Sequence, residues 1–119
     1  MRLQRRKRQQ NKAPPYLSMY KITFTFSKTG WMKYISHLDL MRLFTRSMRR
    51  AGLPLKITQG FSPHPKFSIK RALKLGLESD NEEASVVLRE TINLDNFKNC
   101  LQAQLPEGIR IKDVQGNFN

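Results

Sequence analysis

Four arginines in the middle of the chain are the residues whose type and spacing could most directly do chemistry. Arg42 is followed by Arg46, Arg49 and Arg50, and these spacings place all four side chains on one face if the segment is helical. Like charges so close together on a helix cost about 0.2–0.5 kcal/mol per pair, and a bound polyanion would turn this cost into a gain. We therefore interpret this arginine stripe as a phosphate-binding surface, with a merely solvated helix face as the alternative.

The two histidines, His37 and His64, could act as general base and general acid in RNA cleavage. His37 falls near the apolar side of the predicted helix, however, so we expect a buried, hydrogen-bonded side chain there. As metal ligands the histidines lack a third partner, because Cys100 belongs to a distant helix and Asp39 is expected to cap a helix. We expect no catalytic residue, metal or cofactor, and an RNA endonuclease that uses His37 and His64 stays open as an alternative.

A helix must position the arginine stripe, and the sequence predicts one from His37 to Ala51. Ser36 and, three residues later, Asp39 approximate a capping box, and Asp39 also lies favourably at the positive end of the helix dipole. Gly52 fits the position after the helix, and Pro54 prevents continuation. The face expected to enter the core comprises Leu40, Met41, Phe44, Ser47, Met48 and Ala51.

Alternating apolar and polar residues predict the strands. Tyr20–Phe26 alternates strictly and is predicted to be a strand. A second helix is expected from Asn93, its N-cap, to a stop at Pro106. The acids at Glu82 and Glu83 are interpreted as part of a solvated turn. The other predicted strands are Leu55–Gln59, Lys66–Leu73, Ala84–Arg89 and Ile109–Val114, with a Gly- and Pro-rich loop between the first two.

This order of elements predicts an α+β fold of the ferredoxin-like, split βαβ plan, in which an antiparallel sheet carries two helices on one face. The open face of the sheet would be cationic and rich in hydroxyl groups. It would lack the exposed aromatic side chains that stack bases, so reading of single-stranded RNA in the manner of an RNA-recognition motif is not expected. The open-face residues are Lys21, Thr23, Thr25, Lys56, Thr58, Lys66, Ser68 and Lys70.

The charge distribution indicates the class of partner. A flexible basic arm is expected at 1–19, ahead of a single domain at 20–119. The formal net charge is +13, and residues 1–77 carry 18 lysines and arginines against the single acid Asp39. Such asymmetry favours a nucleic acid. No apolar run approaches about 18 residues, which argues against a membrane, and the lone Cys100 favours a reducing compartment, hence the cytoplasm. The cations of the arm include Arg5, Arg6, Lys7 and Arg8.

Four motifs occur in succession: FSKTG, SHLDLMRLFTRSMRRAGLPL, QGFSPHPK and LGLES. In them the chain resembles the radical-SAM-linked proteins, an uncharacterised bacterial family encoded beside, or fused to, radical SAM enzymes with a cobalamin-binding domain. The resemblance extends from about Tyr20 to Val114 and implies the front part of a longer domain, in an accessory role beside a radical SAM enzyme, an RNA-processing enzyme or the ribosome. It implies a shared site among Ser36, His37, Asp39, Gln59, Gly60, Phe61, Pro63, His64 and Pro65.

Together these observations favour a non-catalytic RNA-binding accessory domain that acts on structured or ribosomal RNA. The arm and the arginine stripe would contact phosphates. A protein-interaction subunit of a radical SAM enzyme, with little affinity for RNA, is the main alternative. The lysines expected to extend the phosphate-binding surface are Lys56, Lys66 and Lys70.

Overall fold

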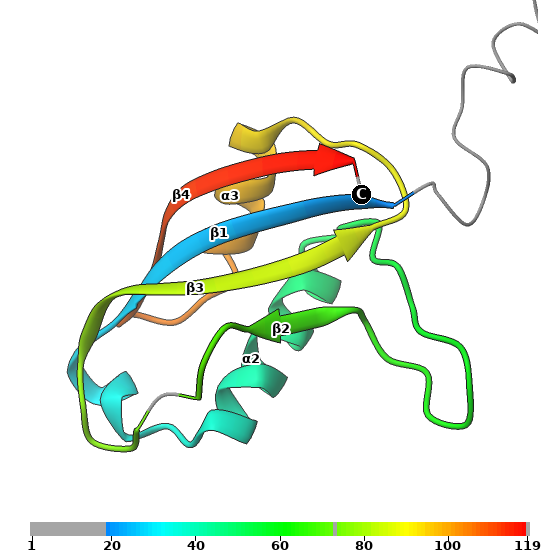
Figure 1. The fold of residues 1–119 in the computed structure, drawn as a ribbon. Coiled ribbons are helices and arrows are strands. Elements are labelled where there is room, and N and C mark those ends of the chain that lie inside the picture. Colours follow the sequence, from blue (N-terminus) through cyan, green and yellow to red (C-terminus); the bar gives the residue numbers. More distant parts are fainter. Residues whose placement is uncertain (1–18, 73, 119) are drawn as a thin grey trace, which may run out of the picture.

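The computed structural model describes residues 19–72 and 74–118. The described strands form one antiparallel sheet in the order β2-β3-β1-β4, and both α-helices lie on the same side of it (Figure 1). This is the predicted ferredoxin-like plan. The elements in chain order are β1 (Tyr20–Lys28), the 3-10 helix η1 (Gly30–Tyr34), α2 (His37–Arg50), β2 (Phe67–Ile69), β3 (Ser79–Leu88), α3 (Leu94–Gln102) and β4 (Ile109–Phe118).

The inward side chains of β1 join the sheet to both helices. Ile22, Phe24 and Phe26 are buried at alternate positions, as the strict alternation of the sequence predicted. The ring centroid of Phe24 lies 5.7 Å from that of Phe44 on α2 and 5.8 Å from that of Phe97 on α3. Because one side chain of β1 contacts both helices, α2 and α3 must share the covered face of the sheet.

Helix α2 begins and ends as local signals predict. Ser36 Oγ accepts a hydrogen bond from the backbone N–H of Asp39 at 3.1 Å, and Gly52 follows the helix with a φ of 74°, a left-handed value that favours glycine. The side chains buried on α2 are Leu40, Phe44, Ser47 and Met48, all within the predicted apolar face. The four arginines are exposed.

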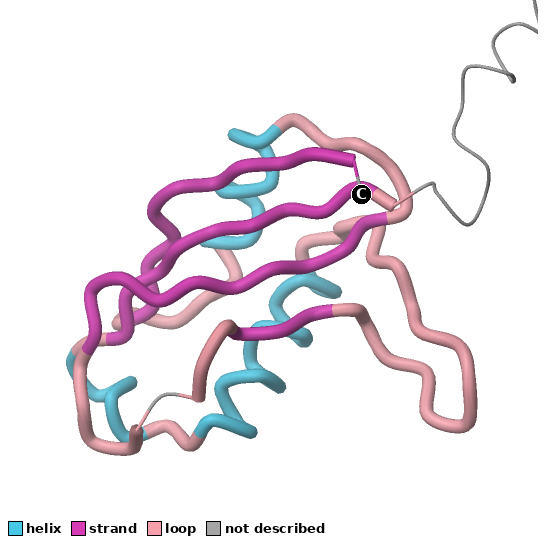
Figure 2. The backbone as a smooth tube through the Cα atoms, in the orientation of Figure 1, coloured by secondary structure: helices cyan, strands magenta, loops and turns pink. Residues whose placement is uncertain are grey.

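The predicted strands Leu55–Gln59 and Lys66–Leu73 are shorter than expected. Leu55 and Ile57 form only isolated bridges, and the second strand is confined to β2. Three prolines in this region, at 54, 63 and 65, remove backbone donors that a continuous ladder would need. We refer to residues 55–66 as the Pro-His-Pro hairpin; it is the long excursion that precedes β2 in Figure 2.

Strand β3 begins earlier than predicted and contains the acidic residues. It spans Ser79–Leu88, and Lys28 at the end of β1 pairs with Ser79. The interpretation of Glu82 and Glu83 as part of a solvated turn is therefore wrong. Glu82 pairs with an inward-facing residue of β1 and lies in phase with the buried positions that follow it in β3, so its side chain enters the covered layer.

Strand β4 continues beyond the predicted end at Val114 to Phe118. The ring of Tyr20 packs edge-on against that of Phe118, with 5.3 Å between centroids. Gly116 lies beneath the Tyr20 ring, and an added Cβ at this position would clash with that ring. The extension of β4 is therefore packed against the start of β1: Phe118 contacts the Tyr20 ring, and Gly116 leaves room for it.

Candidate nucleic-acid interface

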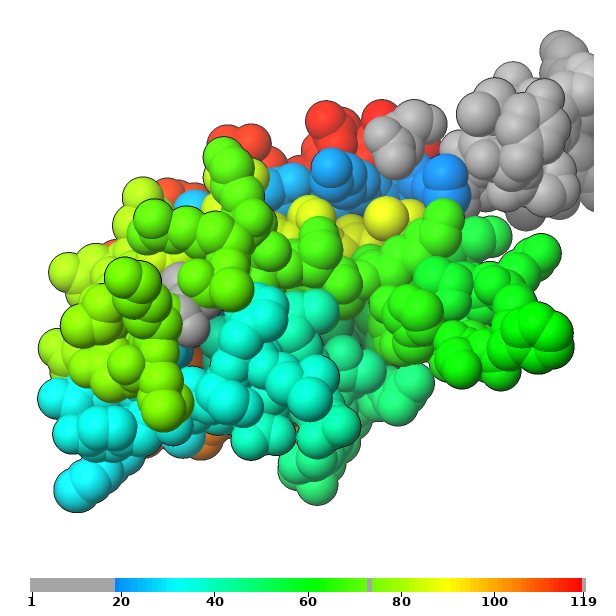
Figure 3. Space-filling view, turned by 60° about the horizontal axis from the view of Figure 1, so that its bottom comes forward, coloured from blue at the N-terminus to red at the C-terminus, as the bar shows by residue number. Residues whose placement is uncertain are grey.

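A groove of about 490 Å³ separates α2 from the Pro-His-Pro hairpin. In Figure 3 the hairpin, in bright green, stands beside the turquoise α2. The groove brings together the arginine stripe and the loop, two features that the sequence presents as separate. Its lining consists of Leu38, Met41, Arg42, Thr45, Arg46, Arg49, His64, Pro65 and Phe67.

Three arginines of α2 form the cationic wall of the groove. Arg42, Arg46 and Arg49 line it and are exposed, whereas Arg50 is exposed but does not line it. Arg42 lies 3.6 Å from the Asp39 carboxylate, an exposed pair of little energetic value. Among the described acids, none forms an ion pair with Arg46 or Arg49. Their guanidinium groups are therefore available to an anionic ligand.

The facing wall carries His64 in a fixed orientation. Its Nδ1 lies 2.8 Å from the carbonyl oxygen of Ser62, and its backbone N–H donates to Thr58 Oγ1 at 3.1 Å. Nδ1 also lies 3.3 Å from Thr58 Oγ1. Because a carbonyl oxygen can only accept, the shorter contact with Ser62 favours the neutral tautomer that carries its proton on Nδ1. Nε2 has no hydrogen-bond partner among the described residues, and the His64 side chain lines the groove.

The floor of the groove is apolar and braced by the core. Phe67 is half-buried and stacks on Phe24, with ring centroids 6.4 Å apart and an interplanar angle of 14°. Leu38 and Met41 extend this surface along the first turns of α2, and Leu38 is 58% exposed. A cationic wall beside an apolar, partly aromatic floor suits an anion that carries a planar group, such as a nucleotide.

The other predicted phosphate-binding residues lie elsewhere. Lys66 and Lys70 are exposed on either side of β2, and Lys70 approaches the Glu83 carboxylate at 3.9 Å. Lys56 is half-buried on the hairpin, outside the sheet. None of the three lines the groove. The arm residues Arg5, Arg6, Lys7 and Arg8 lie outside the described part of the chain.

The residues implied as a shared family site divide into two places. Ser36 and Asp39 form the N-terminal cap of α2, and His37 follows as its first residue. Within the hairpin, His64 and Pro65 line the groove. The exposed tip of the hairpin holds Gln59, Gly60, Phe61 and Pro63.

His37 departs from its expected environment. The side chain is half-buried, and its Nδ1 is enclosed without a hydrogen-bond partner among the described residues. The predicted hydrogen-bonded histidine is therefore wrong for this nitrogen. His37 does not line the groove, so the two histidines do not form one site there.

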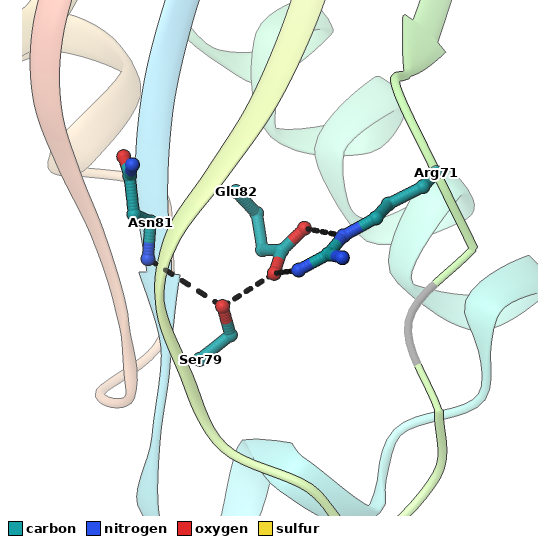
Figure 4. Close-up of polar contacts among 4 residues, drawn as sticks. All are labelled: Arg71, Ser79, Asn81 and Glu82. Carbon is teal, nitrogen blue, oxygen red and sulfur yellow. Dashed lines mark hydrogen bonds and ion pairs between the residues drawn. The ribbon is translucent and has the colours of Figure 1, made fainter.

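Sequence reasoning missed a buried carboxylate on the face of the sheet that the helices cover. Glu82 is 2% exposed, and Arg71 donates to both of its carboxylate oxygens, at 3.1 and 2.9 Å (Figure 4). The Ser79 hydroxyl donates to the same carboxylate. The signal was present: Glu82 shares the period-two phase of Ala84 in the same strand.

Lys28 adds a second cation near this carboxylate. It is 1% exposed, and its Nζ has no hydrogen-bond partner among the described residues. Burial lowers the pKa of Lys28, and the charge of Glu82 partly opposes that effect. The Arg71 hydrogen bonds lower the pKa of Glu82, while burial opposes them. Arg71, Glu82 and Lys28 thus interact electrostatically at the C-terminal end of β1.

Within residues 19–72 and 74–118, no three or more His, Cys, Asp and Glu side chains gather in a way that could hold a metal ion. The helices of the same residues are too short and too polar for any of them to traverse a bilayer.

The fold and the groove define the class: a small ferredoxin-like α+β domain whose helical layer carries a cationic groove with an apolar floor. The chain belongs to the family described as an uncharacterized protein conserved in bacteria (DUF2344), whose model matches residues 21–117. This match includes the whole of α2 and the Pro-His-Pro hairpin. Neither the curated proteins nor the solved structures contain a match to the sequence.

Proposed function

We propose that this protein is a non-catalytic RNA-binding accessory domain and that the groove beside α2 contacts the phosphate backbone. The observation that carries the proposal is the convergence of Arg42, Arg46 and Arg49 with His64 on one groove. Guanidinium groups bind phosphates in a planar, bidentate manner. Three of them in a row along a helix match a repeating anion better than a single charged metabolite.

The surroundings of the groove support a long polyanion. Lys66 and Lys70 are exposed beside β2, and the net charge of the chain is +13. Cations distributed in this way release condensed counterions when they meet a nucleic acid, which supplies sequence-independent affinity. In this proposal the groove anchors the RNA, and Lys66 and Lys70, which do not line the groove, would extend the contact together with the basic arm.

The accessory role on structured or ribosomal RNA rests on the resemblance to the radical-SAM-linked proteins. The proposed cytoplasmic location rests on the lone, unpaired Cys100. A radical SAM enzyme, an RNA-processing enzyme or the ribosome would be the partner. The histidine arrangement favours binding over catalysis, because His64 lines the groove and His37 does not. General acid–base cleavage needs both groups within reach of one phosphodiester.

One observation favours the second candidate, a protein-interaction subunit with little affinity for RNA. Trp31, which is 84% exposed, lies with Tyr34 in η1 close to the exposed Leu75 and Leu77. A hydrogen bond of 2.6 Å from the backbone N–H of Gly76 to the Lys33 carbonyl holds the two segments together. Exposed aromatic and aliphatic clusters of this kind are common in protein interfaces.

A titration of RNA binding across salt concentration distinguishes these functions. The variant Arg42→Ala/Arg46→Ala/Arg49→Ala should bind more weakly, and its log–log salt slope should be shallower by about 0.7 per lost phosphate contact, or about 2 in total. The matched control, Lys74→Ala/Arg89→Ala/Arg110→Ala, loses the same charge at exposed positions outside both the groove and the arginine stripe.

The control should retain most of the affinity of the native protein. Equal losses in the two triple variants would mean that only net charge matters and that the groove is not the site. Negligible RNA affinity of the native protein would favour the protein-interaction subunit.

A further inference from the structure

We propose that the groove accepts an unpaired nucleotide of an RNA chain and discriminates RNA from DNA through His64. This inference rests on the proposed function and specifies its ligand. The base would lie on the apolar floor, the flanking phosphates would meet the arginine wall, and the ribose 2′-hydroxyl would face His64. Loops, bulges and single-stranded ends of structured RNA are the ligands of this class.

The apolar floor argues for an unpaired base. In a duplex the bases are stacked and paired inside, so only the sugar–phosphate backbone would meet the groove. Leu38, which is 58% exposed, and the half-buried Phe67 would then face charged phosphates. A base turned out of its stack would cover these side chains and gain the stacking energy that proteins obtain from aromatic platforms.

The length of the arginine wall and the volume of the groove suit one nucleotide and its flanking phosphates. Arg42 and Arg49 are separated by two helical turns, or about 10 Å along the axis. The volume of about 490 Å³ falls within the range of about 300–1,000 Å³ that holds small organic ligands.

His64 supplies the discrimination between ribose and deoxyribose. When the ring is neutral and Nδ1 donates to the Ser62 carbonyl, Nε2 carries the lone pair, and the His64 side chain lines the groove. A phosphate oxygen can only accept hydrogen bonds and gains nothing from a lone pair. A ribose 2′-hydroxyl can donate to it, and it is the group that DNA lacks.

Three probes of one sequence test the inference: single-stranded RNA, single-stranded DNA with deoxyuridine for thymidine, and duplex RNA. The native protein should bind the RNA strand roughly 2- to 10-fold more tightly than the DNA strand, the effect of one hydrogen bond. The His64→Phe variant keeps an aromatic ring but no nitrogen. It should bring the ratio close to one by weakening RNA binding alone.

The floor is tested by Leu38→Ser, with Leu75→Ser as the matched control at an exposed leucine outside the groove. Leu38→Ser should weaken binding of both single strands and leave duplex binding unchanged, whereas the control should change none of the three. Circular dichroism verifies that each variant is folded; both leucines and His64 are exposed, so their replacement leaves the core intact.

Three results would overturn the inference: equal affinity for the RNA and DNA strands, an RNA preference that persists in His64→Phe, or duplex RNA bound as tightly as the single strand. Each is separable from failure of the proposed function. If the arginine triple variant still loses affinity and salt dependence, phosphate binding at the groove stands while the unpaired ribonucleotide does not.

Discussion

Glu82 shows how a single residue can link β3 to the segment that follows β2. Its buried carboxylate accepts two hydrogen bonds from Arg71 and one from Ser79. The pair is half buried, because the Arg71 side chain is 73% exposed. Loss of the Glu82 charge would leave Lys28 as a buried cation without its neighbouring countercharge, which is costly in a low-dielectric interior.

Glu82→Gln should therefore lower the free energy of unfolding by roughly 2 kcal/mol. This is less than the ~3–5 kcal/mol of a fully buried broken pair, because water screens the exposed Arg71. Urea denaturation at neutral pH gives the value. Glu83→Gln is the matched control: its exposed carboxylate lies 3.9 Å from Lys70, and its loss should cost less than about 0.5 kcal/mol. Equal effects of the two substitutions would contradict the assignment.

The same carboxylate should make stability depend on pH. The Arg71 hydrogen bonds hold the pKa of Glu82 below its ordinary value of 4.5. The unfolded chain then binds this proton more readily than the folded chain, so the free energy of unfolding falls as the pH drops below that value. We expect the stability gap between native protein and Glu82→Gln to be full at neutral pH and to shrink in acid. A gap that stays constant from pH 7 to about 3 would exclude this titration.

At the scale of elements, α2 determines where the arginines lie, and its cap can be tested without touching them. Ser36→Ala removes the hydrogen bond from the backbone N–H of Asp39 and should destabilise the fold by about 1 kcal/mol. Ser36→Asp, which can accept the same hydrogen bond, should retain most of the stability. Thermal unfolding measures both variants. Well below the melting temperature, RNA affinity should be unchanged in Ser36→Ala; a large loss would assign Ser36 a direct role in binding.

Sequence alone was sufficient for the elements that local interactions determine. The caps at Ser36 and Asn93 form as predicted, because a side-chain oxygen and a backbone N–H three residues apart need no tertiary contact. The face of α2 followed from its period. The early start of β3 did not follow from local signals, because its pairing with β1 and the contact of Glu82 with Arg71 join residues far apart in the chain.

The groove was beyond local reasoning for the same reason. His64 lies in a proline-rich loop with no regular period, and nothing in its neighbourhood indicates which helix it faces. Its position depends on β2, which pairs with β3 and carries the end of the hairpin to the edge of the sheet. The sequence identified Arg42 and His64 as candidates. Only the fold showed that they share a surface.

At the scale of the whole molecule, the charge that favours RNA binding should oppose folding. With 22 lysines and arginines against 9 acids, the compact state is destabilised by its own repulsion. The urea midpoint of the free protein should therefore rise with sodium chloride from about 20 to about 500 mM, as screening increases. The arginine triple variant should show a smaller rise.

RNA affinity should change in the opposite direction over the same salt range, because counterion release weakens. The two trends measured together separate self-repulsion from ligand binding. A urea midpoint independent of salt would mean that the cations are too far apart, or too well solvated, to strain the fold.

The root of the Pro-His-Pro hairpin has a consequence for the time course of binding. Backbone hydrogen bonds join Lys56 and Lys66 to each other and both to Val87 on β3, at 2.9–3.0 Å. The hairpin wall is thus tied to the sheet at its root, and the α2 wall is tied to the same sheet by the packing of Phe44 against Phe24. An encounter would then need no slow rearrangement: the arginines would set how fast RNA arrives, and Phe67 and His64 would set how long it stays.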